Sequence, residues 1–180
     1  MIRPSISRVL AVVSAVVLVT AVSALASGSP NKWENIQVGV TYRLYQPGTT
    51  LGMKLNKLKT ASCGVGHDVW VAATYGTYKG TLFSNTRGFA LYEGHPICSN
   101  PGESTKVGSP KIMGVKAYLG VYCSPPKKCT IAQGFKNGFT LQWKAKPSAP
   151  YKKNTTMQLD SSHLSLAQVL KIAKHLKPVG

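Results

Sequence analysis

The sequence predicts an α+β fold, in which an antiparallel sheet of about seven to nine strands carries one C-terminal amphipathic helix packed on a face. Three observations lead to this fold class. Apolar and polar residues alternate with the period of two that is typical of strands over much of the chain. Turn residues separate these stretches at short intervals. Only the C-terminal stretch has clear helical spacing, and an amphipathic helix needs an apolar surface to cover.

The first residues have the composition of a secretory signal peptide. Arg3 and Arg8 precede a long uncharged apolar run, which ends in the small-x-small pattern of residues 24–26. The alternative is an uncleaved membrane anchor, because the run has about the minimum length for a membrane span. The run lacks the flanking Lys or Trp that would hold such a helix at the interface. We therefore expect a signal peptide over residues 1–26 and one secreted α+β domain over residues 27–180, with no transmembrane segment after cleavage.

The first strands follow this leader. "VGVTYRLY" (residues 38–45) places Val38, Val40, Tyr42 and Leu44 on one face. "LGMKL" (residues 51–55) alternates in the same way, and the phase then slips near residues 56–58. Such a slip predicts a bulge or a strand end.

The next stretch, "VWVAAT" (residues 69–74), is apolar on both faces. We expect it centrally in the sheet with another element packed over it. Short strands are predicted at "TLF" (residues 81–83) and "FALY" (residues 89–92), and residues 99–110 have the composition of a loop.

The second half of the sheet begins with "IMGVKAYLGVYC" (residues 112–123), which alternates over its length and predicts one strand. After a turn, "CTIAQ" (residues 129–133) is predicted to run back as the next strand. Asn137-Gly138 is a hairpin signal, and it opens "FTLQWKAK" (residues 139–146), in which Phe139, Leu141, Trp143 and Ala145 should face inward. The last predicted strand is "TTMQL" (residues 155–159).

The single convincing helix lies in "HLSLAQVLKIAKHLKPVG" (residues 163–180). Its apolar residues recur at the i, i+3, i+4 and i+7 spacing of an amphipathic helix. Ser165 and Gln168 form a capping-box pattern at the start. Basic residues suit the negative end of the helix dipole, and Pro178 stops the helix.

The C-terminal part of the chain contains the motifs L-x-W (residues 141–143), T-x-x-L-x-S-S-x-L-S (residues 156–165) and L-x-I-A-x-x-L (residues 170–176). Through these motifs it resembles the end of small bacterial extracytoplasmic domains. Domains of this kind occur in secreted proteins of unknown function and on the outer side of some anti-sigma factors. The resemblance covers about the last 40 residues. It implies a last strand, a serine turn and a closing helix, and it makes an extracytoplasmic sensor or regulatory domain one alternative function.

Four cysteines remain after the leader, and an even count in an exported chain favours disulfides. Cys123 and Cys129 flank a short turn that two prolines stiffen, so the ends of that turn can lie within bridging distance. This pairing leaves Cys63 with Cys98.

The alternative for the second pair is a metal site. Cys63, His67, His95 and Cys98 could bind zinc tetrahedrally. The Cys-to-His and His-to-Cys spacings differ, however, whereas zinc knuckles usually repeat one spacing. An oxidising compartment also consumes paired thiols. We therefore predict disulfides and no metal or other cofactor.

The charge is strongly positive. The chain has 22 Lys and Arg, five Asp and Glu, and a formal net charge of +17. Without Arg3 and Arg8 the net charge is still about +15. Such a protein should be attracted to anionic polymers, glycans or lipid headgroups. Most of the basic residues are dispersed lysines, which lack the fork used for bidentate base readout, so we expect no sequence-specific recognition of nucleic acid.

No catalytic motif is present in the sequence. The five acids form no close pair of the kind used in glycoside hydrolysis, and there is no G-x-S-x-G, P-loop or H-E-x-x-H. The sequence therefore predicts a protein that is not an enzyme. The alternative is a secreted hydrolase with a loop-borne site near His67 and His95.

The outward face of the predicted strands is the main candidate for binding. If these strands are neighbours, it combines lysine charge with tyrosine rings, which suit anionic polymers and sugars. The plainer alternative is an ordinary solvated sheet face. We predict a secreted, disulfide-stabilised, basic, non-enzymatic binding protein of the cell envelope that uses Arg43, Tyr45, Lys116, Tyr118, Tyr122, Lys144 and Lys146.

Overall fold

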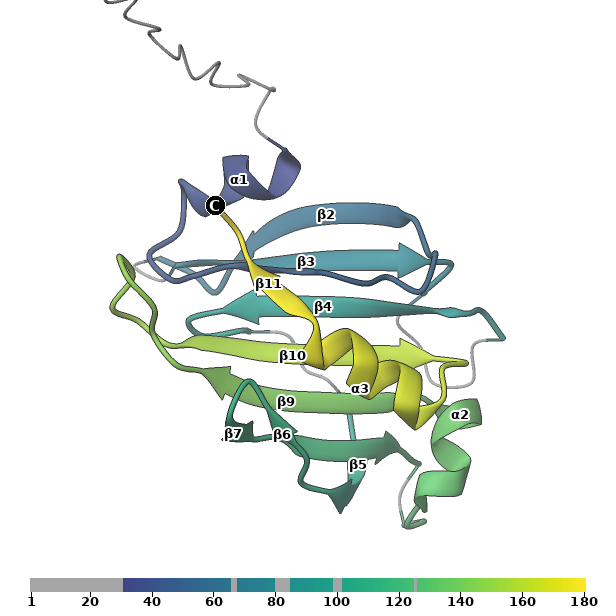
Figure 1. The fold of residues 1–180 in the computed structure, drawn as a ribbon. Helices are drawn as coiled ribbons and strands as arrows, with labels where there is room; N and C mark the ends of the chain where they lie inside the picture. The colour runs from purple at the N-terminus through teal and green to yellow at the C-terminus, as the bar shows by residue number, and fades with distance from the viewer. Residues whose placement is uncertain (1–30, 66–67, 80–84, 99–101, 125) are drawn as a thin grey trace, which may run out of the picture.

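The computed structural model describes residues 31–65, 68–79, 85–98, 102–124 and 126–180. It shows a largely β fold with few helices, built on one antiparallel sheet of seven strands (Figure 1). None of the helices in these ranges is both long and apolar enough to span a membrane. The predicted signal peptide (residues 1–26) and the predicted strand at residues 81–83 lie outside the described residues.

Strand β10 lies in the middle of the sheet, between β4 and β9, and both neighbours run antiparallel to it. Strands β2 and β5 form the two edges. The order across the sheet is β2 (Leu55–Ser62), β3 (Val69–Gly76), β4 (Gly88–Gly94), β10 (Thr155–Ser162), β9 (Phe139–Ala145), β8 (Tyr118–Tyr122) and β5 (Ser104–Gly108).

The remaining elements are short. They are α1 (Lys32–Gln37), a two-stranded sheet of β1 (Tyr45–Pro47) and β11 (Leu176–Pro178), a hairpin of β6 (Lys111–Ile112) and β7 (Val115–Lys116), the 3-10 helix η1 (Ile131–Gln133), α2 (Gly134–Asn137) and α3 (Leu166–Lys174). Figure 1 shows α3 and β11 lying across one face of the large sheet. We call this the inner face, and the opposite one the outer face.

The core lies between the inner face and α3. Leu159 is in register with Leu91 on one side and Leu141 on the other. Val169 and Ile172 of α3 belong to the same apolar core, and all five side chains are fully buried. Burial of each such side chain contributes roughly 1.5–3 kcal/mol. The prediction for the inward face of β9 is confirmed, because its four residues are buried: Phe139, Leu141, Trp143 and Ala145.

Several predicted elements differ in the structure. Residues 38–44 are not a strand, although Val40, Tyr42 and Leu44 are buried as the alternation indicates. The side chain of Gln37 takes the place of a neighbouring strand as the hydrogen-bond partner of this segment. Its Nε2 donates to Tyr42 O at 2.9 Å, and its Oε1 accepts from Leu44 N at 2.7 Å. Strand β3 is not central, since it lies next to the edge strand β2. The predicted strand at residues 51–55 is wrong, because β2 begins only at Leu55; the register shift between Leu55 and Lys57 lies where the phase slip predicted a bulge or a strand end.

The prediction of one strand over residues 112–123 is wrong. A tight turn at Met113 and Gly114, both with positive φ, breaks it into the β6–β7 hairpin and β8. Residues 129–133 lead into η1 and not into a returning strand, and Asn137 ends α2 instead of opening a hairpin. Strand β5 lies within the predicted loop, because it pairs with β8 and is stabilised by that partner.

The C-terminal helix begins as predicted, with Ser165 and Gln168 forming its capping box. It is not the last element, because residues 176–178 turn back as β11 and pair with β1. Val179 is then fully buried, and its amide donates to Leu44 O at 2.9 Å. Tertiary pairing therefore overrides the helical pattern at its end.

Candidate functional site

Both predicted disulfides are present. Cys63 and Cys98 have Cα atoms 5.5 Å apart, and those of Cys123 and Cys129 are 5.9 Å apart. The zinc alternative is wrong, because the thiolates it needs are bonded to each other; His67 itself lies outside the described residues. No cluster of three or more potential metal ligands occurs among the residues that the structure describes. Two disulfides are typical of an oxidising, extracytoplasmic environment.

The seven residues predicted for binding do not share one surface. Tyr118, Tyr122 and Lys144 lie on the outer face of β8 and β9, and Tyr122 is only 7% exposed. Lys116 is exposed on the separate β6–β7 hairpin, and Lys146 is exposed just beyond the end of β9. Arg43 and Tyr45 lie outside the large sheet altogether.

Arg43 has a structural position. Its guanidinium donates to Val179 O at 2.7 Å, Gly180 O at 3.1 Å and Ala149 O at 2.6 Å. It also lies 4.7 Å from the centre of the Tyr151 ring. Tyr45 is 5% exposed and belongs to β1. Sequence alternation placed both residues on the sheet because it could not show that their segment pairs with β11.

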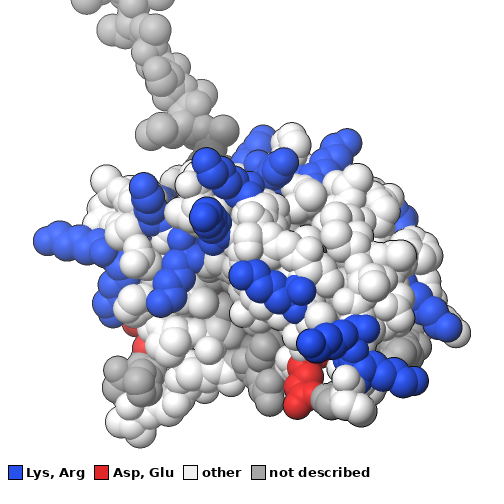
Figure 2. Space-filling view, turned by 90° about the horizontal axis from the view of Figure 1, so that it is seen from below, with Lys and Arg blue, Asp and Glu red and all other residues white. Residues whose placement is uncertain are grey.

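One end of the molecule gathers exposed lysines from several elements. It is formed by β5, the β6–β7 hairpin, the loop closed by Cys123–Cys129, and α2, and Figure 2 views it from below. Basic side chains stand out in separate groups over this view, with few acidic atoms among them. We call these residues the lysine surface: Lys106, Lys111, Lys116, Lys127, Lys128 and Lys136.

Two of these lysines stand in an unfavourable arrangement. Lys111 of β6 is the direct cross-strand partner of Lys116 of β7, and both side chains are exposed. Like charges directly opposite one another destabilise an antiparallel pair. No acid is paired with either, since the one ion pair between described residues joins Lys153 to Asp68 at 2.9 Å. Together, the two lysines concentrate positive charge on the β6–β7 hairpin.

Few acids oppose this charge at the surface. Glu93 is fully buried and Asp160 is 4% exposed. Burial raises the pKa of Glu93 well above its ordinary value, even though Tyr45 N donates to its carboxylate. Burial likewise raises the pKa of Asp160 to about 6. Apart from the paired Asp68, only Glu34 and Glu103 present carboxylates to solvent.

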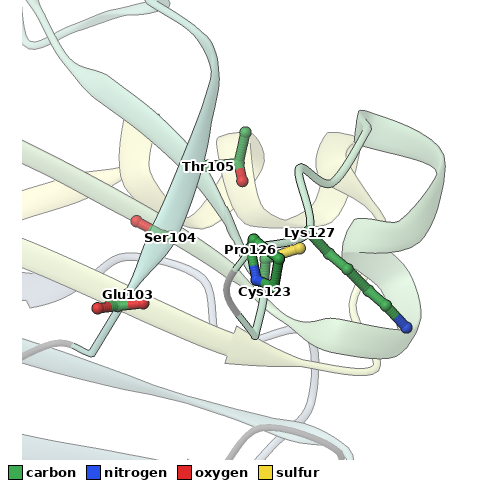
Figure 3. Close-up of a pocket in the computed structure, with 6 residues that line it drawn as sticks. All are labelled: Glu103, Ser104, Thr105, Cys123, Pro126 and Lys127. Atoms are coloured by element: carbon green, nitrogen blue, oxygen red, sulfur yellow. The ribbon is translucent and has the colours of Figure 1, made fainter.

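A shallow pocket of about 170 Å³ adjoins the lysine surface (Figure 3). The Oγ1 atom of Thr105 accepts from Cys129 N at 3.2 Å, which ties β5 to the disulfide loop. Figure 3 shows Lys127 pointing away from Glu103, which lies on the opposite side of the pocket. The lining therefore brings no acid–base pair together; it consists of Glu103, Ser104, Thr105, Cys123, Pro126 and Lys127.

A second pocket of about 170 Å³ lies on the outer face where β4, β10 and β9 meet their connecting loops. It is lined by His95, Pro96, Lys144, Asn154 and Thr156. Lys144, which we predicted for binding, therefore lines the same pocket as His95, which the hydrolase alternative uses. No carboxylate or thiol belongs to this lining. Its chemistry is therefore that of hydrogen-bond donors and positive charge. We call it the outer pocket.

A buried polar cluster in the middle of the outer face was missed from the sequence. Asp160 accepts from Gln158 Nε2 at 2.8 Å, and Thr140 is its cross-strand partner on β9. All three side chains are buried. The polar alternation of "TMQLDSS" (residues 156–162) places Gln158 and Asp160 on one face but also matches a solvated strand, so the sequence alone does not reveal their burial.

Comparison with known proteins finds no relative: no protein-family model, no curated protein and no solved structure matches this chain. The function is therefore argued from the residues themselves.

Proposed function

We propose that this protein is a secreted, non-enzymatic binding protein that associates with an anionic polymer of the cell envelope through the lysine surface. The observation that carries the proposal is the cross-strand pair of Lys111 and Lys116. The repulsion between the two charges costs about 0.2–1 kcal/mol. A polyanion that neutralises both charges would remove this cost when it binds.

The charge balance supports the same conclusion. The chain carries 22 basic and five acidic residues, and two of the acids, Glu93 and Asp160, are buried. The positive field therefore extends over the surface with little local compensation. Lysine ammonium groups are hydrated point charges on flexible stems, so they suit a flexible polyanion better than a ligand of fixed geometry.

A hydrolase at His95 is less well supported. Such an enzyme would need a second acid, base or nucleophile near the histidine. The lining of the outer pocket contains no carboxylate. The charge of Asp68 does reach His95, but the Asp68 carboxylate already accepts hydrogen bonds from Lys153 and Thr41. The sensor or regulatory alternative depends on the C-terminal resemblance alone.

The test is binding to immobilised polyphosphate over a range of salt concentrations. We compare the native chain with the double variant Lys111→Gln/Lys116→Gln. The matched control is Lys57→Gln/Lys59→Gln, which removes two exposed charges from β2 at the opposite edge of the sheet. If each exposed contact contributes about 0.5 kcal/mol, the hairpin variant should bind about fivefold more weakly, and the control should change much less.

Thermal unfolding of both variants separates binding from stability. The hairpin variant should be at least as stable as the native chain, because the like-charge pair is gone. Equal losses of binding in both double variants would show that net charge, and not this surface, is responsible. Absence of salt-sensitive binding by the native chain would overturn the proposal.

A further inference from the structure

We infer that the outer pocket binds a phosphate or sulfate ester group of an anionic glycan, with an adjoining sugar ring against Trp70. This inference rests on the proposed function, because it names the chemistry of the same class of ligand. It concerns a different site from the lysine surface, however, so the two can be tested separately.

The pocket is built on a row of residues across three strands. Thr156 of β10 is the cross-strand partner of Gly94 on β4 and of Lys144 on β9. Neighbouring strands lie about 4.8 Å apart, so this row is about 10 Å wide. A tetrahedral oxyanion can therefore be contacted by groups from more than one strand at once.

Gly94 makes room for the chain that closes one side of the pocket. A Cβ atom at this position would lie 2.5 Å from Pro96 O and 2.7 Å from Trp70 Cβ. No real side chain could occupy that space. Gly94 therefore lets residues 95–96 fold close over the sheet, which brings His95 into the lining and places Trp70 beside it.

His95 is held in one tautomer. Its Nδ1 lies 2.9 Å from Asn154 O, and a carbonyl oxygen can only accept, so Nδ1 carries a proton. The nitrogen left for a ligand is Nε2. It can donate to an oxyanion only when the ring is an imidazolium, whereas the neutral ring offers a lone pair there.

The charges near the pocket favour an anion. Lys144 is exposed at the pocket. Asp68 is close enough to His95 for the two charges to interact, but the Asp68 carboxylate already accepts hydrogen bonds from Lys153 and Thr41. The lining itself supplies an ammonium group, a hydroxyl and an amide. These are the donors that phosphate and sulfate oxygens bind, and a charged donor makes such bonds stronger.

An aromatic surface adjoins these donors. The half-buried rings of Trp70 and Tyr92 lie 6.0 Å apart and are tilted by 47°. Such rings combine a flat apolar face with a polar atom, which suits the face of a sugar. Trp33 and Trp143 are only 5% and 4% exposed, so Trp70 is the indole that a ligand can reach. A donor pocket beside this ring points to a phosphorylated or sulfated glycan.

The first experiment measures protection of Trp70 fluorescence from acrylamide. The probes are sulfated and phosphorylated dextran oligosaccharides, which distinguish the two esters, with unsubstituted dextran and polyglutamate as controls. We expect protection by at least one ester and by neither control. Lys144→Gln should weaken binding about tenfold, as loss of a charged hydrogen bond does. The matched control Lys146→Gln, an exposed lysine outside the lining, should change it less than twofold.

The second experiment follows the His95 imidazole by NMR during titration with inorganic sulfate at one fixed pH. Sulfate should shift the His95 resonances, because the ring lines the pocket. Lys144 and the Asp68–Lys153 pair are the other charged groups near the ring, and the titration is repeated in Lys144→Gln to separate their effect.

The inference is overturned if no ester protects Trp70, or if Lys144→Gln and Lys146→Gln weaken binding equally. It is supported separately from the proposed function if the Lys111→Gln/Lys116→Gln variant loses polyphosphate binding but keeps the Trp70 response. Binding to polyphosphate with no response at Trp70 would remove the inference and leave the proposed function intact.

Discussion

Asp160 of β10 lies directly opposite Thr140 of β9, and both side chains are buried on the outer face. Asp160 Oδ2 accepts a hydrogen bond from Gln158 Nε2 at 2.8 Å. Burial raises the pKa of Asp160 to about 6, and the nearby polar groups of Thr140, Gln158 and Tyr122 offset part of this effect. The ionised carboxylate is therefore costly in the folded state.

This carboxylate should make stability depend on pH. The folded pKa of Asp160 is about 6, against an ordinary 3.8, so the folded state holds the proton more tightly than the unfolded state. The contribution of protonated Asp160 to the free energy of unfolding is complete below about pH 4 and is lost as pH rises through about 6. Relative to the native chain, Asp160→Asn should therefore gain stability over this interval, by up to about 3 kcal/mol.

Urea unfolding at pH 4, 5, 6 and 7 checks this prediction. Glu93 changes stability in the same direction, because burial raises its pKa as well. The difference between the variant and the native chain is thus the informative quantity. Glu103→Gln, which alters an exposed acid, is the matched control. A constant difference between Asp160→Asn and the native chain across this range would contradict the assignment.

The two disulfides should contribute unequally. Cys63 and Cys98 are separated by 35 residues, and Cys123 and Cys129 by six. In the loop-entropy account the longer loop contributes about 4 kcal/mol and the shorter about 2 kcal/mol. The double serine variant of the first pair should therefore unfold at lower urea than that of the second, with each serving as the other's control. The reverse order would show that native packing around the short loop outweighs chain entropy.

Arg43 should act on stability and not on polymer binding. Arg43→Lys keeps the charge but cannot donate at once to Val179 O, Gly180 O and Ala149 O. We expect a loss of about 1–3 kcal/mol in the free energy of unfolding, because carbonyl groups lose their partner. Elution from polyphosphate should not change. Lower affinity at unchanged stability would return Arg43 to the binding surface.

The capping box should set the stability of α3. Ser165 Oγ accepts from Gln168 N at 3.3 Å, and Gln168 Oε1 accepts from Ser165 N at 2.9 Å. Ser165→Ala should cost about 1 kcal/mol. Ser148→Ala, in an exposed loop outside any helix, is the control. Comparable losses in both variants would show that the cap contributes little.

Local chemistry accounts for the features that could be predicted from the sequence. The alternation in β9, the cap at Ser165 and the pairing of Cys123 with Cys129 each depend on residues close together in the chain. Strand β5 and the break at Met113 depend on which segments become neighbours. No pattern within residues 99–123 reveals that choice, because an edge strand is stabilised by its partner and not by its own composition.

Part of the candidate site could likewise be predicted from the sequence, and part depends on which segments become neighbours. Lys144 could be placed on the polar side of its strand from alternation alone. The outer pocket could not be predicted, because it depends on the register that aligns Gly94, Thr156 and Lys144 across three strands. The structural position of Arg43 was equally hidden, since its nearest carbonyl partner is 106 residues away.

The pairing of β11 with β1 has a consequence for the order of events when the protein is made. Arg43 and the buried Val179 meet across 136 residues of chain. The early segment therefore remains without its permanent partners until residues 176–179 have been synthesised. Such distant contacts form late and slowly. The chain should thus stay loosely structured until its last residues have been made, so that the finished fold depends on the complete C-terminal segment.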